Sequence, residues 1–179
     1  MTIYLVRHAA PVIPSTDGPD DMHRPLTAEG FVQAAELAAT LVDLRPTRFV
    51  SSPYPRAIQT IAPAALRCGL PVLTDSRLRE WDSGMAPSPD YARRHAENWS
   101  RPEWARPGGE SLAQLTARAV AALEDYREGV TIVGSHGTFI SRALAGFGLP
   151  VSWEFARKMP MPAVYAIGAE ISGPNLPLR

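Results

Sequence analysis

The chain has 179 residues, and its 18 lysines and arginines balance its 18 aspartates and glutamates, so the net charge is zero. A neutral balance argues against a dedicated nucleic-acid-binding protein and against a protein of membrane surfaces. The hydrophobic fraction of 45% is enough for one core at this length, and we expect a single domain over residues 1–179.

Segments for targeting or membrane insertion are not expected. No stretch approaches the roughly 20 apolar residues that a membrane helix requires. The first residues lack the basic and apolar pattern of a signal peptide. The single cysteine, Cys68, cannot form an intramolecular disulfide, and such sparse usage is typical of a reducing compartment. The sequence therefore predicts a cytoplasmic protein without membrane or nucleic-acid partners.

The first predicted element is a buried strand. Residues 3–6 are apolar, with β-branched and aromatic members, and they lead directly into Arg7 and His8. A loop rich in proline and aspartate follows over residues 11–25. Thr27 is then a candidate N-cap for a helix with one apolar face that ends before Pro46.

Two further strands enclose a second helix. Residues 48–51 and 71–74 are the strand candidates. The helix between them begins near Arg56 and ends at Cys68-Gly69. Arg56 therefore lies where a strand passes into a helix, and Glu80 follows the third strand.

The pattern loosens between residues 83 and 107. A segment of this length inside a compact domain is usually a lid or a binding insert, and we expect it to set substrate specificity. Residues 91–99 form a possible short helix within it. Arg93 and Arg94 are expected to be solvated, although they could instead reach an anionic substrate.

Regular elements return after the insert. Ser111 and Gln114 fit a capping box for a helix that ends near Tyr126. Residues 130–134 form the clearest buried strand, which continues through Ser135-His136 into another helix, and residues 163–167 form a last strand. Strands that alternate with helices indicate an α/β fold of three layers with a largely parallel sheet.

Polar side chains follow three of these strands. Arg7 and His8, Arg56, and His136 converge on one edge if the strands are parallel neighbours. Two arginines and two imidazoles would make a positive pocket, whose natural ligand is a phosphoryl group. The sequence has no glycine-rich phosphate loop, so side chains would hold the phosphate.

Hydrolysis of a phosphomonoester requires a nucleophile and an acid for the leaving alcohol. A neutral imidazole meets the first need, and flanking arginines oppose its protonation. A carboxyl group such as that of Glu80 meets the second. His8, His136 and Glu80 could alternatively form a two-histidine, one-carboxylate metal site, but two nearby arginines would repel a cation.

Six short segments occur in a fixed order along residues 3 to about 145. They are Leu5-Val6-Arg7-His8, Leu26-Thr27-Ala28-Glu29-Gly30-Phe31-Val32-Gln33-Ala34, Ser51-Ser52-Pro53-Tyr54-Pro55-Arg56-Ala57-Ile58-Gln59-Thr60, Leu78-Arg79-Glu80, Gly108-Gly109-Glu110-Ser111 and Val133-Gly134-Ser135-His136-Gly137. This ordered set resembles the motifs of the histidine phosphatase superfamily, also called phosphoglycerate mutase-like.

The resemblance implies a mixed sheet flanked by helices and a phosphatase that hydrolyses a small phosphorylated substrate. It implies that His8 is the nucleophile and becomes a phosphohistidine. Arg7, Arg56 and His136 would then hold the phosphoryl oxygens, with His136 a member of the catalytic set. Glu80 would protonate the leaving group and activate water. No metal ion or other cofactor is implied.

The sequence departs from the family pattern after the histidine. Ala9-Ala10-Pro11 stand where glycine and an acidic or polar residue are common, and Val12-Ile13-Pro14 stand where many members carry a phosphate-binding asparagine. One phosphate contact is therefore missing or supplied from elsewhere. Asp82 also competes with Glu80 for the role of proton donor.

Two other functions remain open from the sequence alone. A phosphoglycerate mutase would use the same pocket but would shield its phosphohistidine from water. A catalytically inactive module could bind a phosphorylated ligand without turning it over.

We expect His23 and His95 to face solvent.

Overall fold

The computed structural model describes residues 2–14, 18–85 and 90–174. Part of the predicted insert, including Pro87 and Pro89, lies outside the described residues. Among the described helices, none is long and apolar enough to cross a membrane. In chain order the elements are β1 (Thr2–Arg7), α1 (Ala28–Asp43), β2 (Arg48–Ser51), α2 (Pro55–Cys68), β3 (Val72–Thr74), the 3₁₀ turn η1 (Ser76–Leu78), α3 (Tyr91–Ser100), α4 (Leu112–Glu124), β4 (Val130–Ser135), α5 (Gly137–Gly146), α6 (Trp153–Lys158), β5 (Ala163–Ile167) and β6 (Ile171–Ser172).

One mixed sheet runs through the molecule in the strand order β3-β2-β4-β1-β5-β6. The pairs β3–β2, β2–β4 and β4–β1 are parallel, whereas β1–β5 and β5–β6 are antiparallel. The predicted α/β class with a largely parallel sheet is confirmed. Because β4 inserts between β1 and β2, the carboxyl ends of these three strands meet at one edge.

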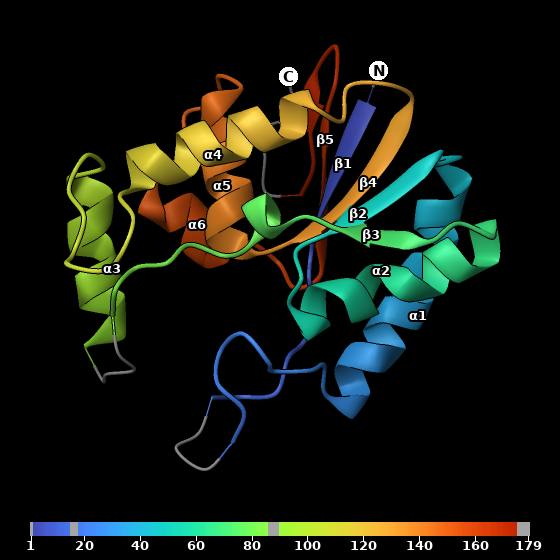
Figure 1. Cartoon of the computed structure of the whole chain (residues 1–179), viewed down its shortest axis with the longest axis horizontal. Helices are drawn as coiled ribbons and strands as arrows, with labels where there is room; N and C mark the ends of the chain where they lie inside the picture. The colour runs from blue at the N-terminus through green and yellow to red at the C-terminus, as the bar shows by residue number, and fades with distance from the viewer. Residues whose placement is uncertain (1, 15–17, 86–89, 175–179) are drawn as a thin grey trace.

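Helices cover both faces of the sheet (Figure 1). Leu5 of β1 and Val133 of β4 pack in one core with residues of α4 and α5, while Val6 and Ile132 pack in a second core with residues of α1 and α2. The alternation follows from the two-residue period of a strand. Each buried aliphatic side chain contributes about 1.5–3 kcal/mol, so both layers are held firmly to the central strands.

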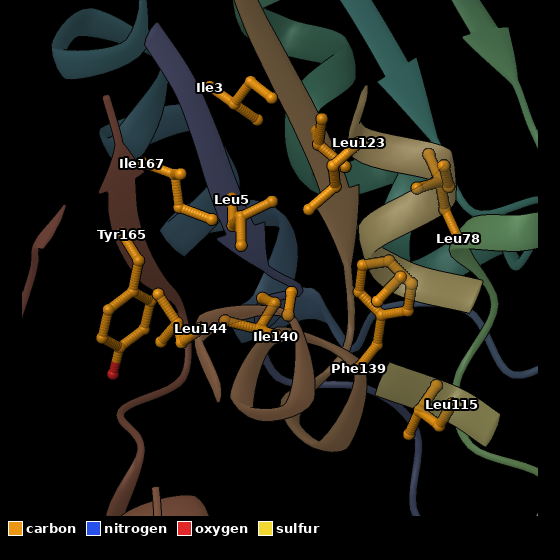
Figure 2. Packing of buried hydrophobic residues seen from close by; sticks show 14 of the residues in the cluster. Ile3, Leu5, Leu78, Leu115, Leu123, Phe139, Ile140, Leu144, Tyr165 and Ile167 are labelled. Carbon is orange, nitrogen blue, oxygen red and sulfur yellow. The ribbon is translucent and has the colours of Figure 1, made fainter. Parts of the chain in front are cut away.

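The core on the α4–α5 side fixes the start of α5. Figure 2 shows Phe139 and Ile140 of α5 packed among Leu5, Leu115 and Tyr165. All five side chains are fully buried. The first turn of α5, which follows His136, therefore has a fixed position relative to β1.

Local sequence signals explain most helix boundaries. The Thr27 side chain accepts a hydrogen bond from the Gly30 amide, and Ser111 and Gln114 form the predicted capping box. The predicted short helix in the insert is present as α3. Sequence analysis did not predict α6 or β6, because elements of six and two residues are too short to show a period.

Gly30 lets α1 approach the chain just after His8. A Cβ atom at this position would lie 2.2 Å from the Ala10 carbonyl oxygen, a backbone atom that cannot swing away. We expect Gly30→Ala to lower the free energy of unfolding by about 1–3 kcal/mol, as overpacking does. Urea denaturation measures this change.

Glu36→Ala is the matched control, because Glu36 is exposed on the same helix. It should leave the unfolding free energy within about 0.5 kcal/mol of the wild-type value. A Gly30→Ala variant as stable as this control would show that the close approach is not required.

Candidate active site

Three parallel strand ends bring His8, Ser52 and His136 to one edge of the sheet. The His8 amide donates to the Ser135 carbonyl at 3.1 Å, and the Ser52 amide donates to the Gly134 carbonyl at 2.8 Å. Hydrogen bonds between neighbouring strands therefore continue for one residue beyond the ends of β1 and β2. The imidazole rings of His8 and His136 consequently lie with centroids 5.3 Å apart. The convergence expected from the sequence is present.

His8 is held in one tautomer. Its side chain is buried, and Nδ1 lies 2.8 Å from the Ala9 carbonyl oxygen. A carbonyl can only accept, so Nδ1 carries the proton in neutral His8. The lone pair therefore resides on Nε2, which is the atom that can attack an electrophile.

The surroundings of His8 keep it neutral. Burial lowers its pKa to about 3, and the positive charges of Arg56, Arg7 and Arg24 act in the same direction against the Ala9 hydrogen bond. A neutral ring, protonated on Nδ1 alone, is therefore present throughout the physiological pH range. Nε2 needs no deprotonation before it can attack an electrophile.

Ser52 orients His136. The Ser52 hydroxyl oxygen lies 2.8 Å from Nε2 of His136 and accepts a hydrogen bond from the Tyr54 amide. We infer that the Ser52 hydroxyl donates its hydrogen to Nε2 of His136. The proton of neutral His136 then lies on Nδ1. Nδ1 is buried and has no hydrogen-bond partner within the described chain. Burial, followed by His8 and nearby arginines, lowers the pKa of His136 well below its usual value.

Arg7 is anchored by backbone oxygens. Its Nη1 donates to the Met159 carbonyl and lies 3.4 Å from the Pro160 carbonyl oxygen. Burial lowers the pKa of Arg7, and the Glu80 carboxyl group opposes this effect. Its Nε is buried without a partner among the residues described, and the Arg7 side chain lines a pocket.

Arg56 is almost fully buried, and Asp21 binds it from the loop before α1. Arg56 Nη1 donates to the Asp21 carbonyl, and Nη2 donates to Asp21 Oδ2 at 3.1 Å. Asp21 also accepts from Arg24 Nε at 3.2 Å, so one carboxylate bridges two arginines. Burial opposes ionisation of Asp21, but the two arginines together hold the pKa of its carboxyl below its usual value.

Glu80 lies at the start of α5. Its Oε1 accepts from the Trp81 and Phe139 amides at 2.8 and 3.0 Å, and Oε2 accepts from the Thr138 amide at 3.2 Å. Burial nevertheless raises the pKa of the carboxyl group, against these bonds and the charge of Arg56. A carboxyl group with a raised pKa in a pocket is suited to proton transfer.

Asp82, the alternative donor, points elsewhere. It is exposed, and its Oδ1 accepts from the Gly84 amide at 3.1 Å. Glu80, in contrast, lines the same pocket as Arg7. The structure thus brings Glu80, and not Asp82, to the cluster of arginines and histidines.

An internal ion pair positions the segment that carries Glu80. Arg118 of α4 donates to the Arg77 and Arg79 carbonyls at 2.6 and 3.1 Å. The same guanidinium is paired with Glu110, whose side chain is largely buried. Through Glu110 and Arg118, the Gly108-Gly109-Glu110-Ser111 motif therefore stabilises the position of the segment that carries Glu80. The sequence did not reveal this role.

Side chains of the motifs hold the chain on both sides of the Pro11 loop. The Ala9 amide donates to Thr60 Oγ1 at 2.9 Å, and the Ala10 amide donates to Gln33 Oε1 at 3.0 Å. Gln59 Oε1 accepts from the Leu26 amide at 2.8 Å. The chain has no asparagine in this region, but Arg24 approaches the histidines from the same loop and is the added cation that sequence analysis missed.

A pocket of about 260 Å³ adjoins this cluster. Arg7 and Glu80 line one part of it, and Tyr91, His95 and Trp153 line another. The prediction that His95 faces solvent was wrong, because α3 packs against α6 and buries the ring to 4% exposure.

Two other polar side chains that were expected to be solvated, His23 and Arg93, lie at the surface. His23 is exposed as predicted. Arg93 is also exposed, and it pairs with Asp90 and Glu97. Arg93 and Arg94 do not line the pocket described above.

Comparison with known proteins identifies the family. Residues 3–173 match the histidine phosphatase superfamily, branch 1, and the chain belongs to this superfamily. The resemblance inferred from the motifs is confirmed.

Proteins similar to this chain carry the names of both mutases and phosphatases. The chain is 33% identical over 156 residues to a probable phosphoglycerate mutase, GpmB, of Shigella dysenteriae, covering 81% of this chain and 71% of that protein. A mycobacterial glucosyl-3-phosphoglycerate phosphatase in complex with VO3 has a similar structure, with a TM-score of 0.77, 23% identity and 98% of each chain covered. A phosphoserine phosphatase mutant of Entamoeba histolytica in complex with phosphoserine superposes with a TM-score of 0.72, 18% identity and coverage of 97% and 95%.

Ser52→Ala tests the assigned tautomer of His136. Loss of the hydroxyl removes a hydrogen bond worth about 1 kcal/mol, so the Nδ1–H form should no longer dominate. Imidazole nitrogen NMR is expected to show mainly Nδ1–H in the wild type and a mixture in the variant. Ser141→Ala, which removes a buried hydroxyl bonded to the Gly137 carbonyl, is the control. An unchanged His136 spectrum in Ser52→Ala would contradict the assignment.

Proposed function

We propose that this protein is a metal-independent phosphatase that hydrolyses a small phosphomonoester through a phosphohistidine on His8. The observation that carries the proposal is the state of His8: a neutral ring with its lone pair on Nε2, flanked by Arg7, Arg56 and His136. Such surroundings suit a transition state whose negative charge is spread over three phosphoryl oxygens, and they disfavour a protonated histidine.

In the first step, Nε2 of His8 attacks phosphorus and the bond from phosphorus to the alcohol oxygen breaks. The leaving oxygen takes a proton from the Glu80 carboxyl group, whose raised pKa favours the acid form. Arg7, Arg56 and the Nδ1–H of His136 hold the phosphoryl oxygens.

In the second step, water attacks the phosphohistidine and passes a proton to the Glu80 carboxylate. The phosphorus–nitrogen bond breaks, and its electrons return to His8 Nε2. Inorganic phosphate leaves, and the enzyme regains its starting protonation state. We propose that residues 83–107, which carry α3, form the insert that selects the alcohol.

A phosphoglycerate mutase is the second candidate, and the name of the relatives at 33% identity favours it. The two functions share the first step. They differ in the acceptor of the phosphoryl group, which is water in a phosphatase and a second hydroxyl of the substrate in a mutase. A mutase would also require a bisphosphorylated primer to load His8.

Hydrolysis of p-nitrophenyl phosphate in EDTA tests the proposed function. We expect metal-independent turnover in the wild type and a loss of at least about 10³-fold in His8→Ala, because the variant lacks the imidazole that forms the proposed covalent intermediate. His23→Ala, at an exposed histidine, should keep wild-type turnover.

The other outcomes separate the candidates. No turnover of any monoester, with retained affinity for phosphate, would favour the inactive binding module. Primer-dependent interconversion of phosphoglycerates that exceeds hydrolysis would favour the mutase. Undiminished turnover in His8→Ala would contradict both enzymatic readings.

The pH dependence of Glu80→Gln tests the proton donor. His8 is neutral above about pH 3, whereas the raised pKa of Glu80 keeps its carboxyl group protonated to a higher pH than usual. The rate of phosphoenzyme formation should therefore fall as pH rises through the pKa of Glu80. In Glu80→Gln this alkaline limb should be absent, and hydrolysis of an alkyl phosphate should be slower by about 10²-fold or more.

Two controls sharpen this measurement. The loss in Glu80→Gln should be smaller for p-nitrophenyl phosphate, whose leaving group needs little protonation. Asp82→Asn should keep the wild-type profile. An alkaline limb that persists in Glu80→Gln and disappears in Asp82→Asn would assign the role to Asp82 instead.

A further inference from the structure

The pocket beside Glu80 has one wall made of aromatic rings. The His95 ring lies 4.0 Å from the Tyr91 ring, 5.4 Å from the Trp153 ring and 5.1 Å from the Trp81 ring, measured between centroids. Tyr91, His95 and Trp153 line the same pocket as Arg7 and Glu80. An alcohol whose oxygen is placed at Glu80 would therefore project toward these rings.

His95 is polar in an apolar setting. Its side chain is 4% exposed, and neither ring nitrogen has a hydrogen-bond partner among the residues that the structure describes. Burial, followed by the charge of Arg106, lowers the pKa of His95 to about 4, so the ring is neutral and offers one donor and one acceptor. A buried polar group without partners destabilises a fold, and its retention points to a function.

The charge of the pocket favours an uncharged alcohol. Arg157, which also lines the pocket, is already bonded to Glu154 at 2.9 and 3.1 Å. Among the lining residues described, no cation beyond Arg7 lacks an acidic partner. A carboxylate on the leaving group would therefore have to compete with the phosphoryl group for Arg7 or with Glu154 for Arg157.

We propose that Tyr91, His95 and Trp153 form the subsite for the leaving alcohol, and that His95 is its specificity-determining residue, selecting alcohols that carry a hydroxylated ring. The proposal rests on the proposed phosphatase function. The aromatic rings cover the apolar face of the substrate ring, and the imidazole exchanges a hydrogen bond with one of its hydroxyl groups.

Tyr91 has to move for this contact to form. Both His95 nitrogens are covered, and the Tyr91 ring stacks on the imidazole while half of Tyr91 remains exposed. Rotation of the exposed Tyr91 side chain uncovers His95 without disturbing the core. The substrate ring then packs against Trp153 and the rotated Tyr91, with a hydroxyl group directed at the edge of the imidazole, where its nitrogens lie.

A matched set of alkyl phosphates tests the preference. Glucose 6-phosphate and adenosine 5′-monophosphate carry hydroxylated rings, cyclohexylmethyl phosphate carries a bare ring, and ethyl phosphate and 3-phosphoglycerate carry none. For the wild type we expect kcat/KM for the better hydroxylated ring to exceed that for the bare ring and for both acyclic esters by about tenfold or more. A wild type that prefers 3-phosphoglycerate would overturn the proposal.

His95→Phe separates recognition from packing. Phenylalanine fills the same space between the aromatic rings but has no ring nitrogen. The higher kcat/KM for the hydroxylated ring than for the bare ring should therefore be lost, mainly through an increase in KM. The rate with the bare ring should stay within about threefold, and the thermal midpoint should not fall, because two unpartnered polar atoms are removed. His95→Gln, which keeps a donor and an acceptor, should restore part of the preference. Trp104→Phe, in the same segment but outside the pocket, should change neither the substrate preference nor the thermal midpoint.

Equal losses on all substrates in His95→Phe, together with a lower thermal midpoint, would show that His95 has only a structural role and would overturn the proposal. Unchanged selectivity in His95→Phe would overturn it as well. Either result with intact wild-type turnover leaves the phosphatase function standing. Failure of the wild type on every monoester would instead reject the proposed function itself.

Discussion

The parallel pairing of β1, β4 and β2 is the constraint on which the site depends. The register places Arg7 beside Ser135 and Ser51 beside Gly134. The next residue of each strand is therefore His8, His136 or Ser52, and all three reach the same edge. A shift of one residue in any strand would turn these side chains to the opposite face and separate them.

This arrangement concentrates positive charge at one point of a chain with no net charge. The arginines are held apart from solvent by backbone carbonyls and by Asp21, and both imidazoles are driven to the neutral form. Neutral rings and guanidinium groups suit a phosphoryl dianion, which would have to displace the Asp21 side chain from Arg56 to bind there. Glu80 completes the set, since its buried carboxyl group is ready to exchange a proton in each half of the proposed reaction.

Much of the fold could be predicted because its signals are local. The apolar run before Arg7, the N-cap at Thr27 and the capping box at Ser111 each lie within a few residues of the element that they define. The five candidate site residues could also be singled out, since each follows or begins a predicted element within an ordered set of motifs, and the structure brings their side chains to one region.

The rest depends on contacts between distant segments. The Ser52–His136 hydrogen bond and the Asp21–Arg56 ion pair join residues far apart in the sequence, and no sequence spacing predicts such contacts. His95 was mistaken for a surface residue because its burial depends on Trp153, which lies on the short helix α6 that the sequence did not reveal.

Rapid quenching of the enzyme with a phosphorus-labelled monoester would capture a covalent phosphoryl group on His8 during turnover. We expect an intermediate that is labile in acid, stable in base, located by peptide mass spectrometry at His8 and absent from His8→Ala. Product release in the first turnover without any labelled protein, or a label on another residue, would show that catalysis does not pass through a phosphohistidine at His8.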